Sequence, residues 1–434
     1  MQTNLKTYRT ILTGTLTLYA IAVLTTMAGM EILGWLSAAI VIGGLVFARK
    51  TLALRQPLLG PIDYVLILLC AIIVASAYIA APANADHVFI AGNSRFVALF
   101  ILLRIGIEIA SPAKAETLLP WLIGLVGLIG AYAIFQNMTG IDLVRGLQNP
   151  IQQEIFGGVP TFRARGMWDH PVRFGHSIAL SLCFPVAYLL TGYVRGFRRP
   201  GLLRSVCLLS SIFAGAGLFF SFTRGAWIGF AAAVLVMSLY IGWRQFAKVV
   251  IIGSLVVAAI LFSSTELRGR FQSMRQPHTD GSSTARLDIW RANIEMFKDH
   301  PVLGVGYGVN EDLITEYYEK LGITQHDGGH AHNNFIQFLS GTGALGFLTY
   351  LAFSILMLLL THRTLRQARE NEDHFLTAVA LAAMGAQLVI HVGGLTEASF
   401  KSAQINHQYF LILALLIALT RARVPAAVAQ RGAP

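Results

Sequence analysis

Residues 225–242 read GAWIGFAAAVLVMSLYIG, a run without one charged side chain. A bilayer core about 30 Å thick is crossed by roughly 20 apolar residues in a helix. Unpaired backbone amides are too costly in lipid, so a spanning run must be a helix or part of a closed barrel. Barrel strands would alternate apolar and polar residues, which this run does not. It therefore predicts a membrane-spanning helix.

Similar runs recur along the whole chain. Of its 434 residues, 55% are hydrophobic and only 13% are charged, whereas a soluble domain has about 25% charged residues. Too few polar side chains remain to coat a surface that faces water. The sequence therefore predicts an all-α integral membrane protein with about twelve transmembrane helices, near residues 10–28, 32–48, 62–80, 94–110, 118–136, 173–192, 202–220, 225–242, 246–263, 333–360, 375–393 and 404–420.

The basic residues predict the orientation, because Lys and Arg are retained on the cytoplasmic side of short loops. With the N-terminus in the cytoplasm, twelve spans return the C-terminus there, and most loop lysines and arginines then fall inside. Two outside segments, 137–172 and 264–332, break this bias, but long segments translocate largely regardless of charge. The net charge of +11 needs no further explanation, and we expect no nucleic-acid partner.

The predicted spans divide the chain into three parts. Residues 1–263 hold the first nine spans and the loop 137–172. Residues 264–332 form a large outside loop domain, which is too long for a simple connector. Residues 333–434 hold the last three spans and a cytoplasmic tail.

The loop domain is predicted to be helical. The stretch TARLDIWRANIEMFK at 284–298 has apolar residues at helical spacing, and a second helix is expected over 309–321. The glycine-rich stretch LGVGYG at 303–308 lacks the spacing of a nucleotide-binding loop, so we interpret it as turns. Segment 137–172 mixes Gly, Pro, Arg and aromatic residues without helical period, and we expect an irregular loop there.

Arginine is conspicuous on the outer side. An arginine at the membrane edge can simply extend its charge to lipid phosphates. Several arginines on loops that converge at one place would instead suggest an anionic, phosphorylated ligand, because the guanidinium fork matches phosphate oxygens. The candidates are Arg163, Arg165, Arg224, Arg286 and Arg291.

Three histidines precede the tenth predicted span, in QHDGGHAHNNF: His326, His330 and His332. One interpretation is a metal site, although no cysteine or well-spaced carboxylate completes a ligand set. A second is that they cap the following helix. A third is a general base, because neutral imidazole can take a proton from a hydroxyl. No outer Asp-x-Asp pair or compact carboxylate cluster indicates a magnesium or manganese site.

Four stretches together resemble the O-antigen ligase and polymerase superfamily: RARGMWDHPVRFGH at 163–176, SFTRGAWIG at 221–229, TARLDIWRANIEMFKDHPVLGVGYG at 284–308 and HAHNNFIQFLSGTGALGF at 330–347. The resemblance implies a GT-C-like glycosyltransferase in the bacterial inner membrane, with a helical periplasmic loop domain over its active site. Such enzymes take glycans from undecaprenyl diphosphate in lipopolysaccharide biosynthesis, without a divalent metal or other cofactor.

The resemblance also implies roles for particular residues. It makes His332 the residue that activates the acceptor hydroxyl, with His330 as its nearest rival. Arginines would bind the diphosphate: Arg165, Arg224 and Arg286, with Arg163 and Arg291 as further candidates. A ligase, which transfers the glycan to a lipid A–core sugar, is the first interpretation. A polymerase of the same superfamily is the alternative, and a transporter or flippase for an anionic lipid-linked glycan is the alternative from another class.

Overall fold

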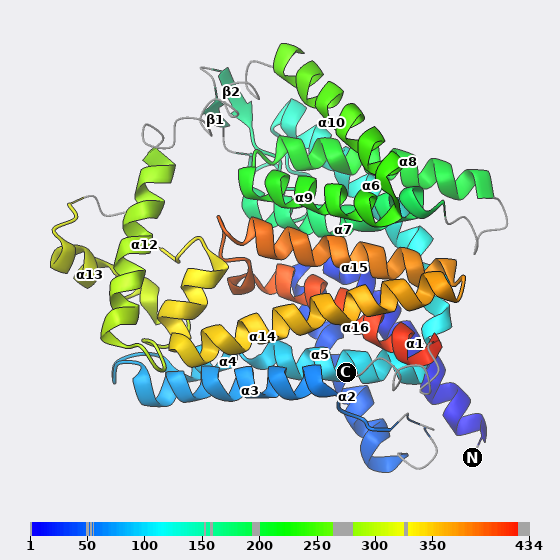
Figure 1. The fold of residues 1–434 in the computed structure, drawn as a ribbon, viewed down its shortest axis with the longest axis horizontal. Coiled ribbons are helices and arrows are strands. Elements are labelled where there is room, and N and C mark those ends of the chain that lie inside the picture. The colour runs from blue at the N-terminus through cyan, green and yellow to red at the C-terminus, as the bar shows by residue number, and fades with distance from the viewer. Residues whose placement is uncertain are drawn as a thin grey trace.

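The computed structural model describes residues 2–48, 52, 54, 56–151, 153–156, 159–192, 200–263, 281–324 and 329–423. These residues form a bundle of long helices (Figure 1). The elements are α1 Gln2–Thr25, α2 Met27–Phe47, α3 Pro61–Ala75 with the π-helix Ser76–Ala80, α4 His87–Gly92, α5 Arg95–Ala110, the 3-10 helix Pro112–Lys114, α6 Ala115–Thr139, β1 Gln153–Phe156, β2 Val159–Phe162, α7 Pro171–Thr191, α8 Pro200–Phe220, α9 Arg224–Ile241, α10 Trp243–Ser263, α12 Gly281–Asp299, the 3-10 helix Val309–Glu311, α13 Ile314–Leu321, α14 Asn334–Glu370, α15 His374–Gly393, the 3-10 helix Ser399–Lys401 and α16 Ala403–Arg423.

Helices coincide with all the predicted spans. Within the described residues, ten helices are long and apolar enough to cross a bilayer, which confirms a multi-pass membrane protein. Helices α1 and α10 cover the first and ninth predicted spans but are not among those ten. The count of twelve spans and the orientation therefore stay predictions.

Cys183 and Cys207 are buried and Cys70 is half-buried, and all three are free thiols.

One expectation about the outer segments was wrong. Segment 137–172 is not wholly irregular, because β1 and β2 form an antiparallel hairpin in which Gln153 lies opposite Phe162. Ile155, Val159 and Thr161 are β-branched residues that favour strands, but each strand is only four residues long. So short a run gives no clear period in the sequence. The fold is all-α apart from this hairpin in the described part of the chain.

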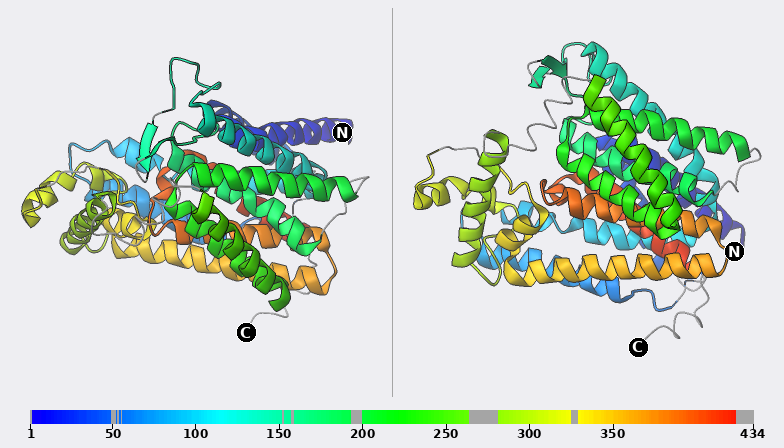
Figure 2. Two further views of the ribbon diagram at one scale, coloured as in Figure 1. Left: turned by 90° about the horizontal axis from the view of Figure 1, so that it is seen from above. Right: turned by 45° about the horizontal axis from the view of Figure 1, so that its top comes forward.

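The loop domain does contain the two expected helices, α12 and α13. Figures 1 and 2 show both at one end of the bundle, beside the beginning of α14 and the end of α15. Helix α12 begins at Gly281, earlier than the predicted 284, and the second helix is split into a 3-10 turn and α13. Gly304, Gly306 and Gly308 all have positive φ, so the glycine-rich stretch forms turns as predicted.

A break in α14 fixes the position of the loop domain. Gly343 has φ 63° and ψ −166°, and a Cβ there would lie 2.3 Å from the backbone of Val302. The opened backbone of α14 pairs with the chain after α12, where the amide of Val305 donates to the carbonyl of Ser340 over 3.0 Å. Glycine is required at such a close approach of two backbones. The break therefore ties α12 to the first turns of α14.

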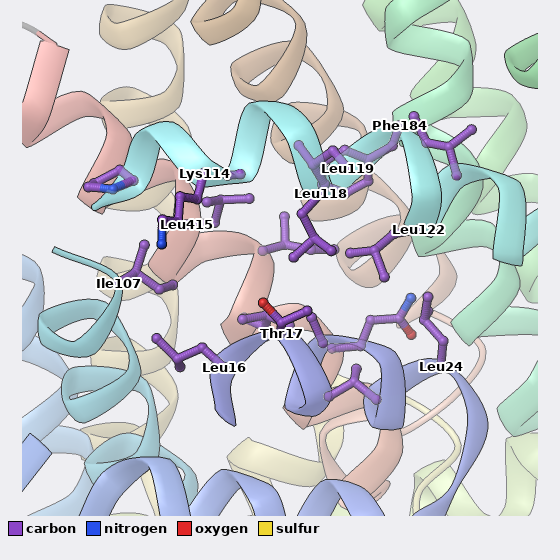
Figure 3. Close-up of a pocket in the computed structure, with 18 of the residues that line it drawn as sticks. Leu16, Thr17, Leu24, Ile107, Lys114, Leu118, Leu119, Leu122, Phe184 and Leu415 are labelled. Atoms are coloured by element: carbon purple, nitrogen blue, oxygen red, sulfur yellow. The ribbon is translucent and has the colours of Figure 1, made fainter. Parts of the chain in front are cut away.

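A separate apolar cavity lies within the bundle. Its volume is about 160 Å³, and it is bounded by α1, α5, α6, α7 and α16 (Figure 3). Leucines such as Leu16, Leu119 and Leu122 line it, and Lys114 stands at one end. None of its lining residues is a predicted site residue, so this cavity is distinct from the end of the bundle that carries α12 and α13.

Candidate active site

A buried carboxylate joins the two histidines. Glu397 lies in the connection between α15 and α16 and is 9% exposed. Its Oε1 is 2.7 Å from Nε2 of His330, and its Oε2 is 3.2 Å from Nδ1 of His332. The two imidazole rings lie 4.1 Å apart between centroids. The two predicted catalytic candidates thus share one carboxylate that the sequence analysis did not identify.

Electrostatics assign the protons in this cluster. Burial alone would raise the pKa of Glu397, but the hydrogen bonds and charges of His330 and His332 outweigh burial and hold the pKa well below its usual range. Glu397 is therefore a carboxylate, which can only accept hydrogen bonds. His332 must donate from Nδ1, which leaves its Nε2 lone pair available to a substrate. His330 donates from Nε2 in the same way.

The chain around His332 is held rigidly. His332 has φ 44°, a left-handed conformation that is uncommon outside glycine. Asn333 on its C-terminal side caps α14 by accepting from the amides of Phe335 and Ile336. Ala331 on its other side is held twice: Trp290 of α12 donates to its carbonyl over 2.8 Å, and its amide donates to Gln337. Contacts on both sides thus offset the strain at His332.

Buried amides lock α12 onto α14. Asn310 donates to Oδ1 of Asn293 over 2.8 Å and exchanges hydrogen bonds with Gln337. Ser340 donates to the same Oδ1 of Asn293 over 2.8 Å. All four side chains are at most 1% exposed. Satisfied polar networks of this kind rigidify a core, so the helix that carries Trp290 is fixed relative to the histidines.

Arg286 lies on the same side of α12 as Trp290, because residues four apart share a helix face. Trp290 touches the histidine segment, so Arg286 is one turn away from it. The buried His176 of α7 is within electrostatic range of both Arg286 and Glu397. Arg286 therefore belongs to the same end of the bundle as the carboxylate.

Arg224 begins α9 directly beside the connection that carries Glu397. A Cβ on Gly225 would lie 2.2 Å from Oγ1 of Thr396, and a Cβ on Gly229 would lie 2.9 Å from the carbonyl oxygen of Val389. These glycines allow α9 to pack closely against α15 and the chain that follows it. Arg224 and Arg286, which are far apart in sequence, are thus both placed at the end of the bundle that carries the His–Glu cluster.

Arg163 lies at the rim of this site. Its Nε donates to the carbonyl of Ser221 over 3.1 Å, and its Nη1 contacts Glu154 of β1 at 3.0 Å. Ser221 belongs to the turn that leads into Arg224. His170, which caps α7, is within electrostatic range of both Arg163 and Glu397. No pattern in the sequence indicated a role for His170.

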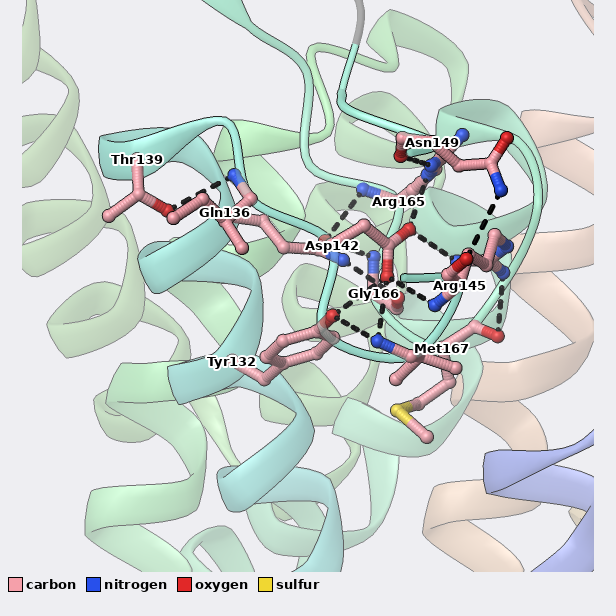
Figure 4. A network of polar contacts seen from close by, with 11 residues as sticks. Tyr132, Gln136, Thr139, Asp142, Arg145, Asn149, Arg165, Gly166 and Met167 are labelled. Atoms are coloured by element: carbon pink, nitrogen blue, oxygen red, sulfur yellow. Dashed lines mark hydrogen bonds and ion pairs between the residues drawn. The ribbon is translucent and has the colours of Figure 1, made fainter. Parts of the chain in front are cut away.

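Arg165 is engaged in a different network, shown in Figure 4. Its Nε contacts the buried carboxylate of Asp142 at 2.8 Å, and its Nη2 donates to the carbonyl of Asn149. Arg145 contacts the same Asp142 oxygen at 2.8 Å, and Tyr132 donates to the other oxygen. Burial would raise the pKa of Asp142, but these three partners lower it overall. Arg165 thus fastens the loop after α6.

Arg291 does not join the cluster. Arg291 is turned to solvent, with its side chain 71% exposed, and pairs with Asp288 one turn earlier at 3.1 Å. His326 lies outside the described residues. Of the predicted residues, the structure therefore brings together His330, His332, Arg224 and Arg286, with Arg163 at the edge.

Glu397 supplies the carboxylate that the metal interpretation of the histidines lacked. No carboxylate was identified to complete a metal ligand set, but the ligating atoms of His330, His332 and Glu397 all lie within 4.8 Å of one another. Glu397 is an acidic residue in the short connection between two predicted spans, and that position was the available signal. It was missed because Glu397 is 65 residues from His332 in sequence.

Comparison with known proteins finds a family match for part of the chain. Residues 208–351 match the family model described as O-antigen ligase, and no curated protein matches the chain significantly. The matched segment contains Arg224, Arg286, His330 and His332, whereas Glu397 lies beyond it. Members of this family are glycosyltransferase-like membrane enzymes that act on lipid-linked glycans in glycan assembly. This match supports the resemblance of the chain to the O-antigen ligase and polymerase superfamily.

Proposed function

We propose that this protein is an O-antigen ligase. It transfers a glycan from undecaprenyl diphosphate to a lipid A–core sugar, on the periplasmic face of the bacterial inner membrane. The observation that carries the proposal is the His332–Glu397 pair, with Arg224 and Arg286 placed at the same end of the bundle.

His332 is the proposed general base. Glu397 accepts the Nδ1 proton and fixes the tautomer in which Nε2 has a free lone pair. Nε2 takes the proton of the acceptor hydroxyl while the hydroxyl oxygen attacks the anomeric carbon. The imidazolium that forms is stabilised by the carboxylate beside it, as in catalytic triads. A positioned base typically contributes about 10²–10⁴-fold to the rate.

The arginines act on the leaving group. As the new glycosidic bond forms, the bond between the anomeric carbon and the diphosphate oxygen breaks, and negative charge develops on undecaprenyl diphosphate. Arg224 and Arg286 offset that charge by binding the diphosphate. Losing one such preorganised donor typically costs about 3 kcal/mol of transition-state stabilisation. Attack opposite the leaving group inverts the anomeric configuration, and a product with retained configuration would refute direct displacement.

The loop arrangement favours ligase over polymerase. The ion pairs of Asp142 with Arg145 and Arg165 hold the loop after α6 against its own helix (Figure 4). Among the described residues, the segment with α12 and α13 extends as a domain at the end of the bundle where α14 begins (Figure 1). One loop domain over the site is the layout that the ligase interpretation expects.

The test is a transfer assay with purified components. The parent protein and His332→Ala are incubated with an undecaprenyl-diphosphate glycan and lipid A–core, without added metal, and the lipid products are separated. We expect glycosylated lipid A–core from the parent and at least about 10²-fold less from the variant. Binding of the carrier should persist in His332→Ala, since the arginines are intact.

Other results would redirect the assignment. Longer carrier-linked glycan, without glycosylated lipid A–core, would identify a polymerase. Carrier binding by both proteins without any covalent product would favour a transporter or flippase. Normal transfer by His332→Ala would contradict the proposed base, and the same assay on His330→Ala would then test its rival.

A further inference from the structure

Three side chains in the candidate site form a ligand set for a transition metal. Nε2 of His330, Nδ1 of His332 and a carboxylate oxygen of Glu397 lie within 4.8 Å of one another. Two histidines and one carboxylate are a ligand set that binds zinc with a position left open for water. Imidazole also suits cobalt and nickel, whereas magnesium and calcium prefer several oxygen ligands. One carboxylate is too few for those two ions.

The three ligand side chains are already in contact with one another. Both imidazoles direct a ring nitrogen at Glu397, which is itself 9% exposed. The contacts of Trp290 and Gln337 with Ala331 fix the chain between the two histidines. Partners that orient ligand residues typically change metal affinity by about 10–100-fold. The site is also accessible, because the histidine side chains are 30% and 28% exposed.

We propose that His330, His332 and Glu397 bind a zinc-like divalent ion reversibly, and that the bound ion switches the transferase off. The inhibitory part rests on the proposed function. The ion takes the Nδ1 lone pair of His332, so the ring proton moves to Nε2, and His330 shifts its proton from Nε2 to Nδ1. No proton is lost overall. Nε2 of His332 then carries a proton and cannot accept one from a hydroxyl.

Metal binding is tested on the full chain, purified with a tag that contains no histidines and treated with a chelator that is then removed. Co²⁺ is titrated and its visible ligand-field absorption is recorded, and Zn²⁺ binding is measured by calorimetry with Mg²⁺ as the comparison ion. We expect one bound Co²⁺ or Zn²⁺ per chain and no Mg²⁺ binding. His330→Ala and Glu397→Gln should each weaken binding at least about tenfold.

The matched control is His300→Ala, because His300 is an exposed histidine of the same loop domain. It should leave Co²⁺ binding unchanged. Thermal unfolding and size-exclusion profiles show whether each variant is folded. If the parent gives no ligand-field absorption, or if folded His330→Ala and Glu397→Gln both bind like the parent, the metal site is refuted.

Inhibition is measured separately, by the transfer assay with Zn²⁺ and then with excess chelator. The proposal predicts that Zn²⁺ at saturating concentration lowers the rate at least tenfold, and that the chelator restores it. Binding without any change in rate would refute the inhibitory role. If the parent binds Co²⁺ through these residues but makes no transfer product at all, the proposed function fails while the metal site stands.

Discussion

Two buried carboxylates in connections between helices each hold two basic partners, and the partners differ in kind. Asp142 lies between Arg145 and Arg165. Glu397 lies between His330 and His332. A guanidinium is always protonated, so the Asp142 cluster can only hold the loop together. An imidazole can gain and lose a proton near neutral pH, so the Glu397 cluster can take part in chemistry.

Glu397→Gln should give the largest effect, because glutamine keeps the size of the side chain but removes the charge that stabilises the imidazolium. We expect the transfer rate to fall about 10²–10⁴-fold, with the protein still folded. The measurement is the initial rate per folded molecule. A loss below about threefold would mean that the two carboxylates do not differ in function.

Arg224→Ala and Arg286→Ala should come next. Each removes a group proposed to offset charge on the departing diphosphate, and each should lower the rate about 10²-fold, equivalent to about 3 kcal/mol. The matched control is Arg165→Ala, which removes an arginine from the Asp142 cluster. If Arg165→Ala lowers the rate per folded molecule as much as the other two, Arg165 also serves the diphosphate, as the resemblance implied.

Asp142→Asn should affect stability more than rate. It leaves the guanidinium groups of Arg145 and Arg165 without their shared carboxylate, and we expect a loss of about 1–3 kcal/mol in the free energy of unfolding. The lowered transition appears in thermal unfolding in detergent. The transfer rate per folded molecule should fall less than tenfold. A larger fall, with the loop intact, would remove the proposed distinction between the clusters.

The direction in which pH changes the stability difference between the parent and Asp142→Asn can also be predicted. The pKa of Asp142 is lowered in the folded protein, so its ion pairs stabilise the fold above the pKa of an unfolded aspartate, about 3.9. The contribution is lost as the pH falls through the lower folded pKa. The stability difference between the parent and Asp142→Asn should therefore be constant above about pH 5 and shrink below about pH 4.

Arg291→Ala should have the smallest effect. Its ion pair with Asp288 is exposed, and such pairs contribute about 0–1 kcal/mol. Both the transfer rate and the unfolding temperature should match the parent within error. A tenfold loss of rate would place Arg291 in contact with substrate during the reaction.

Much of this fold could be predicted from local patterns. Long apolar runs specify helices in lipid, and every predicted span coincides with one. The helical loop domain followed from periodic residues such as Leu287, Ile289 and Trp290. The β-hairpin did not, because two four-residue strands give no measurable period.

The candidate site could be predicted only in part. His330, His332, Arg224 and Arg286 stand in recognisable stretches, so their residue types and order indicated the family. Glu397 could not be joined to them, because no local rule brings the connection after α15 to the start of α14. For the same reason nothing in the sequence showed that Arg165 is paired with Asp142. Both pairings depend on tertiary packing.

A double-mutant cycle on His332→Ala and Glu397→Gln tests the central claim most directly. If Glu397 acts through His332, the double variant should transfer glycan no more slowly than His332→Ala alone, since residues that act as a unit are strongly non-additive. The rates of all four proteins are measured per folded molecule in the same assay. If the two losses instead multiply in the double variant, Glu397 and His332 act independently, and the proposed base pair is contradicted.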